Sequence, residues 1–230
     1  MPSLAPRRTR VKVCCIRSAA EVALAVDHGA DAVGFVAAMP SGRGPIADEL
    51  IAELVPTVPP PVATFLLTCE TDPDAIVDHV RRTRPSTVQL VDEGAVPAHG
   101  TVRDALPGLR IVQVIHVEDG SAVDRAVAAS VTADALLLDS GRPALAVPEL
   151  GGTGRVHDWS VSAAIVEVSP VPVLLAGGLD PGNVAEAIAQ VRPFGLDLCS
   201  GLRPHGGLDD GRLRAFMGAV ADADRAAVAH

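Results

Sequence analysis

Val171-Pro-Val-Leu-Leu-Ala-Gly-Gly178 and Phe194-Gly-Leu-Asp-Leu-Cys-Ser-Gly201 are two short apolar runs, and each ends in small residues ahead of a predicted helix. A third run, Leu136-Leu-Leu-Asp139, ends in an isolated carboxylate. In a parallel barrel the phosphate usually lies on the loops after the last two strands, where glycine leaves backbone N–H groups accessible. These three strand ends therefore predict a phosphate-binding enzyme site on a barrel.

The rest of the chain supplies the other strands that a barrel needs. Short β-branched runs alternate with alanine-rich amphipathic stretches, and two stretches, 29–33 and 132–136, repeat a Gly/Thr-Ala-Asp-Ala pattern at the joint between helix and strand. The predicted strands are 10–16, 31–37, 62–67, 86–90, 110–115, 134–139, 171–175 and 194–199. The predicted helices are 18–29, 47–55, 72–83, 96–106, 119–130, 159–168, 181–191 and 208–224. An open doubly wound sheet shows the same alternation, but eight strands favour the barrel. We expect one α/β domain over 1–230, a (β/α)8 TIM barrel with a flexible extension at 1–9 and a tail at 225–230.

The composition suits an apolar core and excludes several classes of protein. Of the 230 residues, 48% are hydrophobic and 20% are charged, which argues against disorder. Only 2% are aromatic and the net charge is −9, so the chain offers neither a basic surface nor stacking rings for nucleic acid. The first residues lack the apolar core of a signal peptide, and no apolar run is long enough to span a membrane. We expect a cytoplasmic protein that binds neither nucleic acid nor membranes.

The spacing of cysteine and histidine indicates neither a metal site nor a disulfide framework. The four cysteines, Cys14, Cys15, Cys69 and Cys199, form no Cys-x-x-Cys motif. The seven histidines are scattered, and none has a partner at the spacing of metal ligands. We therefore expect reduced thiols and no metal ion.

Two residues at predicted strand ends suit acid–base catalysis. Cys14 lies near the end of the first strand, and strand alternation places it on one face with Lys12, a cation able to stabilise a thiolate. A free cysteine is also a common core residue. Asp139 would be a general acid or base if burial raised its pKa. It equally suits a cap or a turn ahead of Ser140.

Other positions suit ligand binding. The candidate phosphate-binding residues are Gly177, Gly178, Ser200 and Gly201, where glycine admits a close approach. Plain turn chemistry explains them as well. Arg43 follows the second strand and suits a substrate carboxylate, although a surface arginine is the simpler interpretation. The residues of a candidate mobile lid are Gly151, Gly152, Thr153 and Gly154, and a plain connection is the alternative.

Taken together, these motifs resemble the N-(5′-phosphoribosyl)anthranilate isomerase family, barrel enzymes of tryptophan biosynthesis. The matching motifs are Lys12-Val-Cys14, Gly29-Ala-Asp-Ala-Val-Gly-Phe35, Ser41-Gly-Arg43, Val88-Gln-Leu90, Leu138-Asp139, Gly151-Gly-Thr-Gly154, Asp158-Trp159, Gly177-Gly-Leu179 with Asn183-Val184, Arg192-Pro-Phe194, Asp197 and Ser200-Gly201. They span nearly the whole chain. No single motif is decisive, but their joint order and spacing are specific.

The resemblance implies an Amadori rearrangement of a small phosphoribosyl amine, with no metal or organic cofactor. Asp139 would protonate the ribose ring oxygen, and Cys14 would remove the C2 proton as a thiolate. That thiolate needs a lowered pKa, for which Lys12 is the expected cause. Arg43 would bind the anthranilate carboxylate, and the two glycine loops would bind the phosphate. The residues expected to support the site are Lys12, Asp197 and Arg203.

The chain also departs from the family pattern. Cys15 stands where the family has glycine, Gly44-Pro-Ile46 replaces a tyrosine-containing stretch, Val91 replaces a histidine, and Leu202-Arg203 replaces Val-Glu. Two alternatives therefore stay open: a related enzyme that isomerises another N-(5′-phosphoribosyl) amine, and a non-catalytic phosphosugar-binding barrel. The histidine-pathway substrate would need a second phosphate site, which the first-half strand ends do not offer. A pure binder would need neither Cys14 nor Asp139.

Overall fold

Eight parallel strands close into a barrel in the computed structural model, which describes residues 8–40, 44–141 and 157–228. The strands are β1 (Arg10–Val13), β2 (Ala32–Val36), β3 (Ala63–Thr68), β4 (Thr87–Leu90), β5 (Arg110–His116), β6 (Ala135–Asp139), β7 (Val173–Leu175) and β8 (Gly195–Leu198). They pair in chain order, and β8 returns to β1 with Lys12 opposite Asp197. The predicted TIM barrel is confirmed, and the open sheet is excluded.

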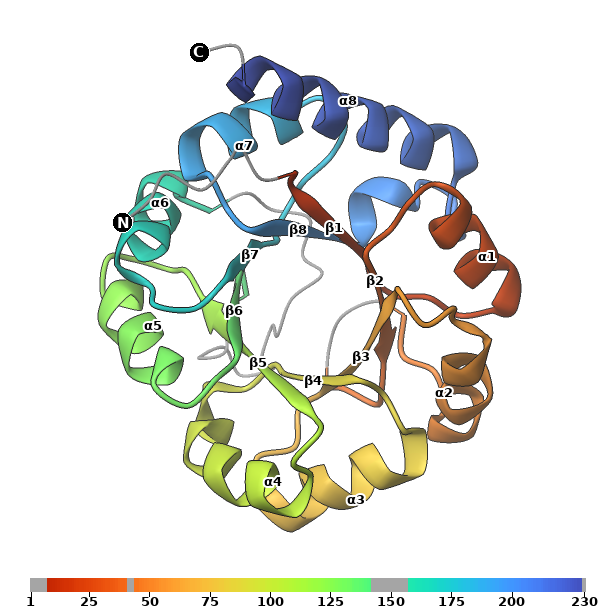
Figure 1. Cartoon of the computed structure of the whole chain (residues 1–230), viewed down its shortest axis with the longest axis vertical. Coiled ribbons are helices and arrows are strands. Elements are labelled where there is room, and N and C mark those ends of the chain that lie inside the picture. The colour runs from red at the N-terminus through yellow and green to blue at the C-terminus, as the bar shows by residue number, and fades with distance from the viewer. Residues whose placement is uncertain (1–7, 41–43, 142–156, 229–230) are drawn as a thin grey trace.

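The helices form an outer ring around the closed strands (Figure 1). They are α1 (Ala19–Asp27), α2 (Asp48–Leu54), α3 (Pro73–Thr83), α4 (His99–Ala105), α5 (Ala122–Ser130), α6 (Trp159–Val168), α7 (Val184–Val191) and α8 (Asp210–Val228). Short 3₁₀ turns are η1 (Val55–Thr57), η2 (Glu93–Ala98) and η3 (Ser200–Leu202). Ser18, Asp72 and Asp158 each accept a hydrogen bond from a first-turn N–H, as expected of N-caps.

Three helices, α4, α5 and α7, begin three residues later than the sequence predicts, and the delays of α4 and α7 have a clear local cause. The stretch predicted as a helix from 96 starts as the 3₁₀ turn η2, which contains Pro97. At the other site, α7 begins at Val184 rather than 181. The Asp180 carboxylate accepts the N–H groups of Gly182 and Asn183, and so holds this segment in a turn.

Side chains of each strand alternate between the barrel interior and the layer beneath the helices. On β1, Val11 and Val13 pack outward, whereas Lys12 is buried on the opposite face of the strand. On β6, Leu136 and Leu138 pack outward, and Leu137 lies inside. The inner cluster consists of Cys14, Cys15, Ala32, Val36, Phe65, Leu67, Val91, Val112, Val114, Leu137, Leu174 and Ala176. The residues placed to take part in chemistry are therefore those whose side chains face the barrel interior, as the side chains of Lys12 and Leu137 do.

None of the helices in the described part of the chain is both long enough and apolar enough to cross a bilayer.

Candidate active site

Cys14 lies directly after β1 and faces the barrel interior. Its backbone N–H donates to the Leu198 carbonyl of β8 at 2.7 Å, which holds the residue against the closing strand. Only 4% of the residue is exposed. The space for its thiol depends on Gly34 of β2, where an added Cβ would lie 2.9 Å from the Cys14 Sγ. Cys14 thus lies on the same face as Lys12, as strand alternation predicts.

Lys12 lies one layer below the thiol and is almost completely buried. Its Nζ donates to the Asp197 Oδ1 at 2.8 Å, and the two side chains are 1% and 8% exposed. The ammonium also stands 5.1 Å from the centre of the Phe65 ring. Burial alone lowers the pKa of Lys12, but Asp197 and Cys14 outweigh it, and the net pKa is raised. Lys12 is therefore a fixed cation beneath Cys14.

The Cys14 thiol holds its proton more tightly than a free cysteine does. Burial raises the pKa of Cys14 to about 11; Lys12 acts in the opposite direction and Asp197 adds to the rise. Lys12 thus lowers the pKa of Cys14 as expected, but burial of the thiol outweighs it, and the net pKa is raised rather than lowered. The thiolate is a minor form of the free protein, and a strong base when it forms.

Asp139 ends β6 on the inner face, two residues after Leu137. Its Oδ1 accepts the Ser140 N–H at 2.7 Å, which fixes the carboxyl group at the barrel mouth. Burial raises the pKa of Asp139; the Ser140 N–H and His116 oppose the rise, and Asp197 adds to it. A carboxyl group with a raised pKa can retain a proton for donation nearer neutral pH. The pKa of Asp139 is thus shifted in the direction that favours a general acid.

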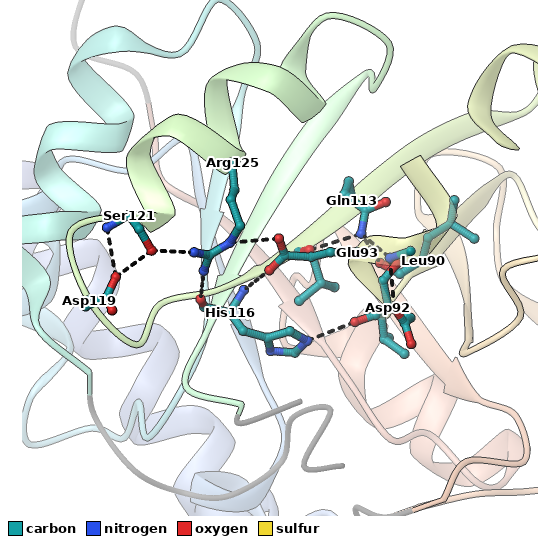
Figure 2. Close-up of polar contacts among 11 residues, drawn as sticks. Leu90, Asp92, Glu93, Gln113, His116, Asp119, Ser121 and Arg125 are labelled. Atoms are coloured by element: carbon teal, nitrogen blue, oxygen red, sulfur yellow. Dashed lines mark hydrogen bonds and ion pairs between the residues drawn. The ribbon is translucent and has the colours of Figure 1, made fainter. Parts of the chain in front are cut away.

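His116 is a site residue that the sequence does not single out. It ends β5 and pairs in register with Asp139, but the predicted strand stops at 115. Its Nε2 lies 2.9 Å from the Val91 carbonyl oxygen. Figure 2 shows its backbone held between Glu93 and Arg125. The alternation of side chains along the strand could have identified it. Val112 and Val114 lie on one face, and His116, two residues further on, falls on the same face.

The two candidate phosphate loops pack closely against each other. Gly177 and Gly178 have φ values of 86° and 66°, a conformation that favours glycine. Gly201 is required for space, because an added Cβ would lie 2.2 Å from the Leu179 carbonyl oxygen. The loop after β7 is held by Asn183, whose Nδ2 donates to the Gly178 carbonyl at 2.9 Å. Gly177, Gly178, Ser200 and Gly201 thus lie on loops that follow adjacent strands.

Arg203 forms an ion pair with Glu21 of α1. Its guanidinium binds the Glu21 carboxylate through both Nη atoms, at 2.7 and 2.9 Å, and only 4% of its side chain is exposed. Burial raises the pKa of Glu21, but hydrogen bonds from Arg203 and Leu208 lower it overall. Arg203 therefore joins the loop after β8 to α1, and we do not assign it to phosphate.

Cys15 departs from the expected alternation. Its φ is 62°, so the chain turns there and its side chain joins the inner cluster. Cys15 forms a disulfide with Cys199, with their Cα atoms 5.9 Å apart. The expectation of no disulfide is therefore wrong. The spacing rules compare positions along the chain, whereas closure of the barrel makes the ends of β1 and β8 neighbours.

Two predicted parts of the site lie outside the described residues. They are the carboxylate-binding Arg43 and the candidate lid of Gly151, Gly152, Thr153 and Gly154. Within residues 8–40, 44–141 and 157–228, no cluster of three or more metal-ligating side chains occurs.

An inward thiol, an inward carboxyl group and two glycine loops at one barrel mouth define a TIM-barrel enzyme suited to acid–base chemistry on a phosphorylated substrate. The model of the N-(5′-phosphoribosyl)anthranilate isomerase family matches residues 11–219. The chain belongs to this family, whose members are isomerases of tryptophan biosynthesis.

Individual relatives agree with the family match. The chain is 38% identical over 212 residues to N-(5′-phosphoribosyl)anthranilate isomerase of Methanocella arvoryzae, covering 91% of this chain and 96% of the relative. It is 37% identical over 216 residues to that of Haloferax volcanii, covering 92% and 93%. The structure of the Thermotoga maritima isomerase matches with a TM-score of 0.80 and 27% identity, over 93% of this chain and 99% of that one. Another structure of a phosphoribosyl anthranilate isomerase (TM-score 0.77, 26% identity, covering 93% and 99%) is a complex with reduced 1-(o-carboxyphenylamino)-1-deoxyribulose 5-phosphate.

Proposed function

We propose that this chain converts N-(5′-phosphoribosyl)anthranilate to 1-(2-carboxyphenylamino)-1-deoxyribulose 5-phosphate, with Asp139 as general acid and Cys14 as general base. The observation that carries the proposal is the placement of both groups at one barrel mouth, on β6 and directly after β1. Two strands, β7 and β8, separate them and lead into the candidate phosphate loops. A sugar phosphate anchored there can meet the acid and the base from different sides.

The first step opens the ribose ring. Asp139 gives its proton to the ring oxygen while the bond between that oxygen and C1 breaks, and the nitrogen lone pair forms the C=N bond of a protonated Schiff base. The raised pKa of Asp139 supports this role, because burial favours the protonated form from which the ring oxygen takes its proton.

The second step moves a proton from C2. The Cys14 thiolate removes it, and the electron pair of the C–H bond forms a C1=C2 double bond while the C=N electrons return to nitrogen. The resulting enolamine tautomerises to the ketone as C1 gains a proton. A thiol with a pKa of about 11 gives little thiolate, but that thiolate is strongly basic, and Lys12 provides a nearby cation.

Binding groups complete the proposal. The backbone N–H groups around Gly177-Gly178 and Ser200-Gly201 bind the phosphate, and the glycines support this role because their positive φ values and the absent Cβ of Gly201 let the two loops pack together. Arg43 binds the anthranilate carboxylate through its planar guanidinium. We also propose a cytoplasmic location, since the charged phosphate of the substrate does not cross a bilayer unaided.

A fluorescence assay for loss of phosphoribosylanthranilate tests the proposal. The wild-type protein should consume the substrate, and Cys14→Ser and Asp139→Asn should each lower kcat by at least about 100-fold, the lower end of general acid–base contributions. Cys69→Ser is the matched control, because Cys69 is the other free cysteine of the described chain and lies at the end of β3. Turnover of a different phosphoribosyl amine alone would favour the related isomerase. Binding without turnover would favour the non-catalytic barrel.

A further inference from the structure

His116 is completely buried and lies beside Asp139. The two residues are register partners on β5 and β6, and adjacent strands lie about 4.8 Å apart. Val112 and Val114 line the barrel interior, so alternation places the His116 side chain on the same inner face as Asp139. The imidazole is therefore an immediate neighbour of the proposed general acid.

The ring nitrogens of His116 are not equivalent. Nε2 lies 2.9 Å from the Val91 carbonyl oxygen, and since a carbonyl only accepts, Nε2 carries a proton. Nδ1 is buried and has no hydrogen-bond partner among the residues that the structure describes. A buried polar atom without a partner is unusual and calls for a functional explanation.

The backbone of His116 is held on both sides (Figure 2). Its N–H donates to the Glu93 Oε1 at 3.1 Å, and its carbonyl accepts the Arg125 Nη2 at 2.7 Å. Arg125 and Glu93 are themselves paired at 2.9 Å. With the Val91 contact, these bonds fix the ring against rotation. The charges of Glu93 and Arg125 offset each other on the outer side of the residue.

The other charged groups near Asp139 are already paired. Lys12 and Asp197 face it from β1 and β8, and their mutual ion pair at 2.8 Å largely cancels their effect at a distance. When Asp139 gives its proton away, a carboxylate remains in a buried position, and the single N–H of Ser140 compensates only part of the cost of burying it. His116 is the group of the described chain placed to be that partner.

We propose that His116 is a positioning residue that acts through Asp139: its Nδ1 is the hydrogen-bond partner of the Asp139 carboxyl group as the proton leaves. This role rests on the proposed function of Asp139. One proton moves, from the Asp139 carboxyl group to the ring oxygen, and none is transferred to or from His116. The hydrogen bond forms only as charge develops, so it favours the reaction more than substrate binding.

His116→Gln tests the proposal, because the Gln amide can still donate to the Val91 carbonyl but has no group at the position of Nδ1. We expect kcat to fall by about 10–100-fold with KM within about twofold. The protonation midpoint of the Asp139 carboxyl group, followed by infrared difference spectroscopy and assigned by its absence in Asp139→Asn, should move to higher pH. An unchanged midpoint, or an unchanged kcat, overturns the proposal.

His99→Gln is the matched control. His99 is as buried as His116, but it lies outside the barrel wall with both ring nitrogens bonded, to Thr132 and Gln113. It should lose stability without a change in the Asp139 midpoint or in kcat.

A second measurement keeps His116 in place: Asp139→Asn should shift the ¹⁵N resonance of the His116 Nδ1 and leave that of His99 unchanged. A His116 signal that does not respond overturns the pairing. Both spectroscopic tests work even without turnover, so a failure of the proposed activity is distinguishable from a failure of this inference.

Discussion

Lys12 shows how one buried side chain depends on the charges around it. A lysine beneath a cysteine suggests a stabilised thiolate when only the sequence is considered. In the structure, Asp197 lies 2.8 Å from the ammonium, and the net effect on Cys14 is a pKa raised to about 11. Burial of the thiol is the largest cause of this rise, and Asp197, 185 residues from Lys12 in sequence, adds to it. The sequence therefore predicts the direction in which Lys12 acts, but not the net pKa of Cys14, because burial and the Asp197 contact arise only in the folded barrel.

The pKa values of the proposed acid and base predict an unusual pH profile. Catalysis needs a protonated Asp139 and a deprotonated Cys14. Burial raises the pKa of both groups, that of Cys14 to about 11, and we expect their ordinary order, with the carboxyl group titrating below the thiol, to be kept. Between the two pKa values, the protonated fraction of Asp139 falls as the thiolate fraction of Cys14 rises. We therefore expect kcat/KM to stay level far into the alkaline range. Below the pKa of Asp139 it should fall about tenfold per pH unit, since the thiolate disappears.

The measurement is kcat/KM against pH for wild type, with Cys69→Ser as the control that should share its profile. A narrow bell centred near pH 7 would show that the thiol pKa in the working enzyme is far lower than in this structure.

At the scale of elements, the repeated joint at 29–33 and 132–136 has a structural purpose. The Asp31 carboxylate accepts the Val11 N–H at 2.9 Å, and the Asp134 carboxylate accepts the Ile111 N–H at 2.8 Å. Each aspartate thus ties the start of one strand to the start of the next. The repeat in the sequence marks equivalent positions in the two halves of the barrel.

Asp134→Ala should lower the free energy of unfolding by about 1–3 kcal/mol at pH 7, because it leaves the Ile111 N–H without its acceptor. Burial raises the pKa of Asp134, but the Ile111 N–H and the guanidinium of Arg103 outweigh it and lower the pKa. The stabilisation is therefore present above the unfolded pKa, near 4, and is lost as pH falls below it. Urea unfolding at pH 7 and pH 3 measures both values. Asp104→Ala, an exposed position on α4, should change neither.

The presence of each helix and strand could be predicted better than the residues at which it begins and ends. All eight strands appear where apolar runs predict them, because burial on both faces demands such runs. The start of α7 could not be predicted, because Asp180 forms a turn rather than a cap. The end of β5 matters most: one residue beyond the predicted strand lies His116.

At the scale of the whole molecule, closure of the barrel creates contacts that no spacing rule along the chain can foresee. Cys15 and Cys199 are 184 residues apart in sequence, yet β1 and β8 are adjacent strands. The Lys12–Asp197 pair and the Cys14 backbone bond to Leu198 cross the same seam. The seam therefore links the proposed base to the candidate phosphate loop that begins at Ser200.

The disulfide should stabilise the closed barrel by a measurable amount. A bridge that closes so long a loop restricts the unfolded chain strongly, and native disulfides typically contribute about 2–4 kcal/mol. We expect the oxidised protein to unfold at a higher urea concentration than the same protein in a thiol reductant. Cys199→Ala should unfold at the reduced midpoint under both conditions. Cys69→Ser should keep the full difference, because Cys69 is free and half-buried at the end of β3. Equal midpoints for oxidised and reduced wild type would show that the seam is held by its hydrogen bonds and the Lys12–Asp197 pair alone.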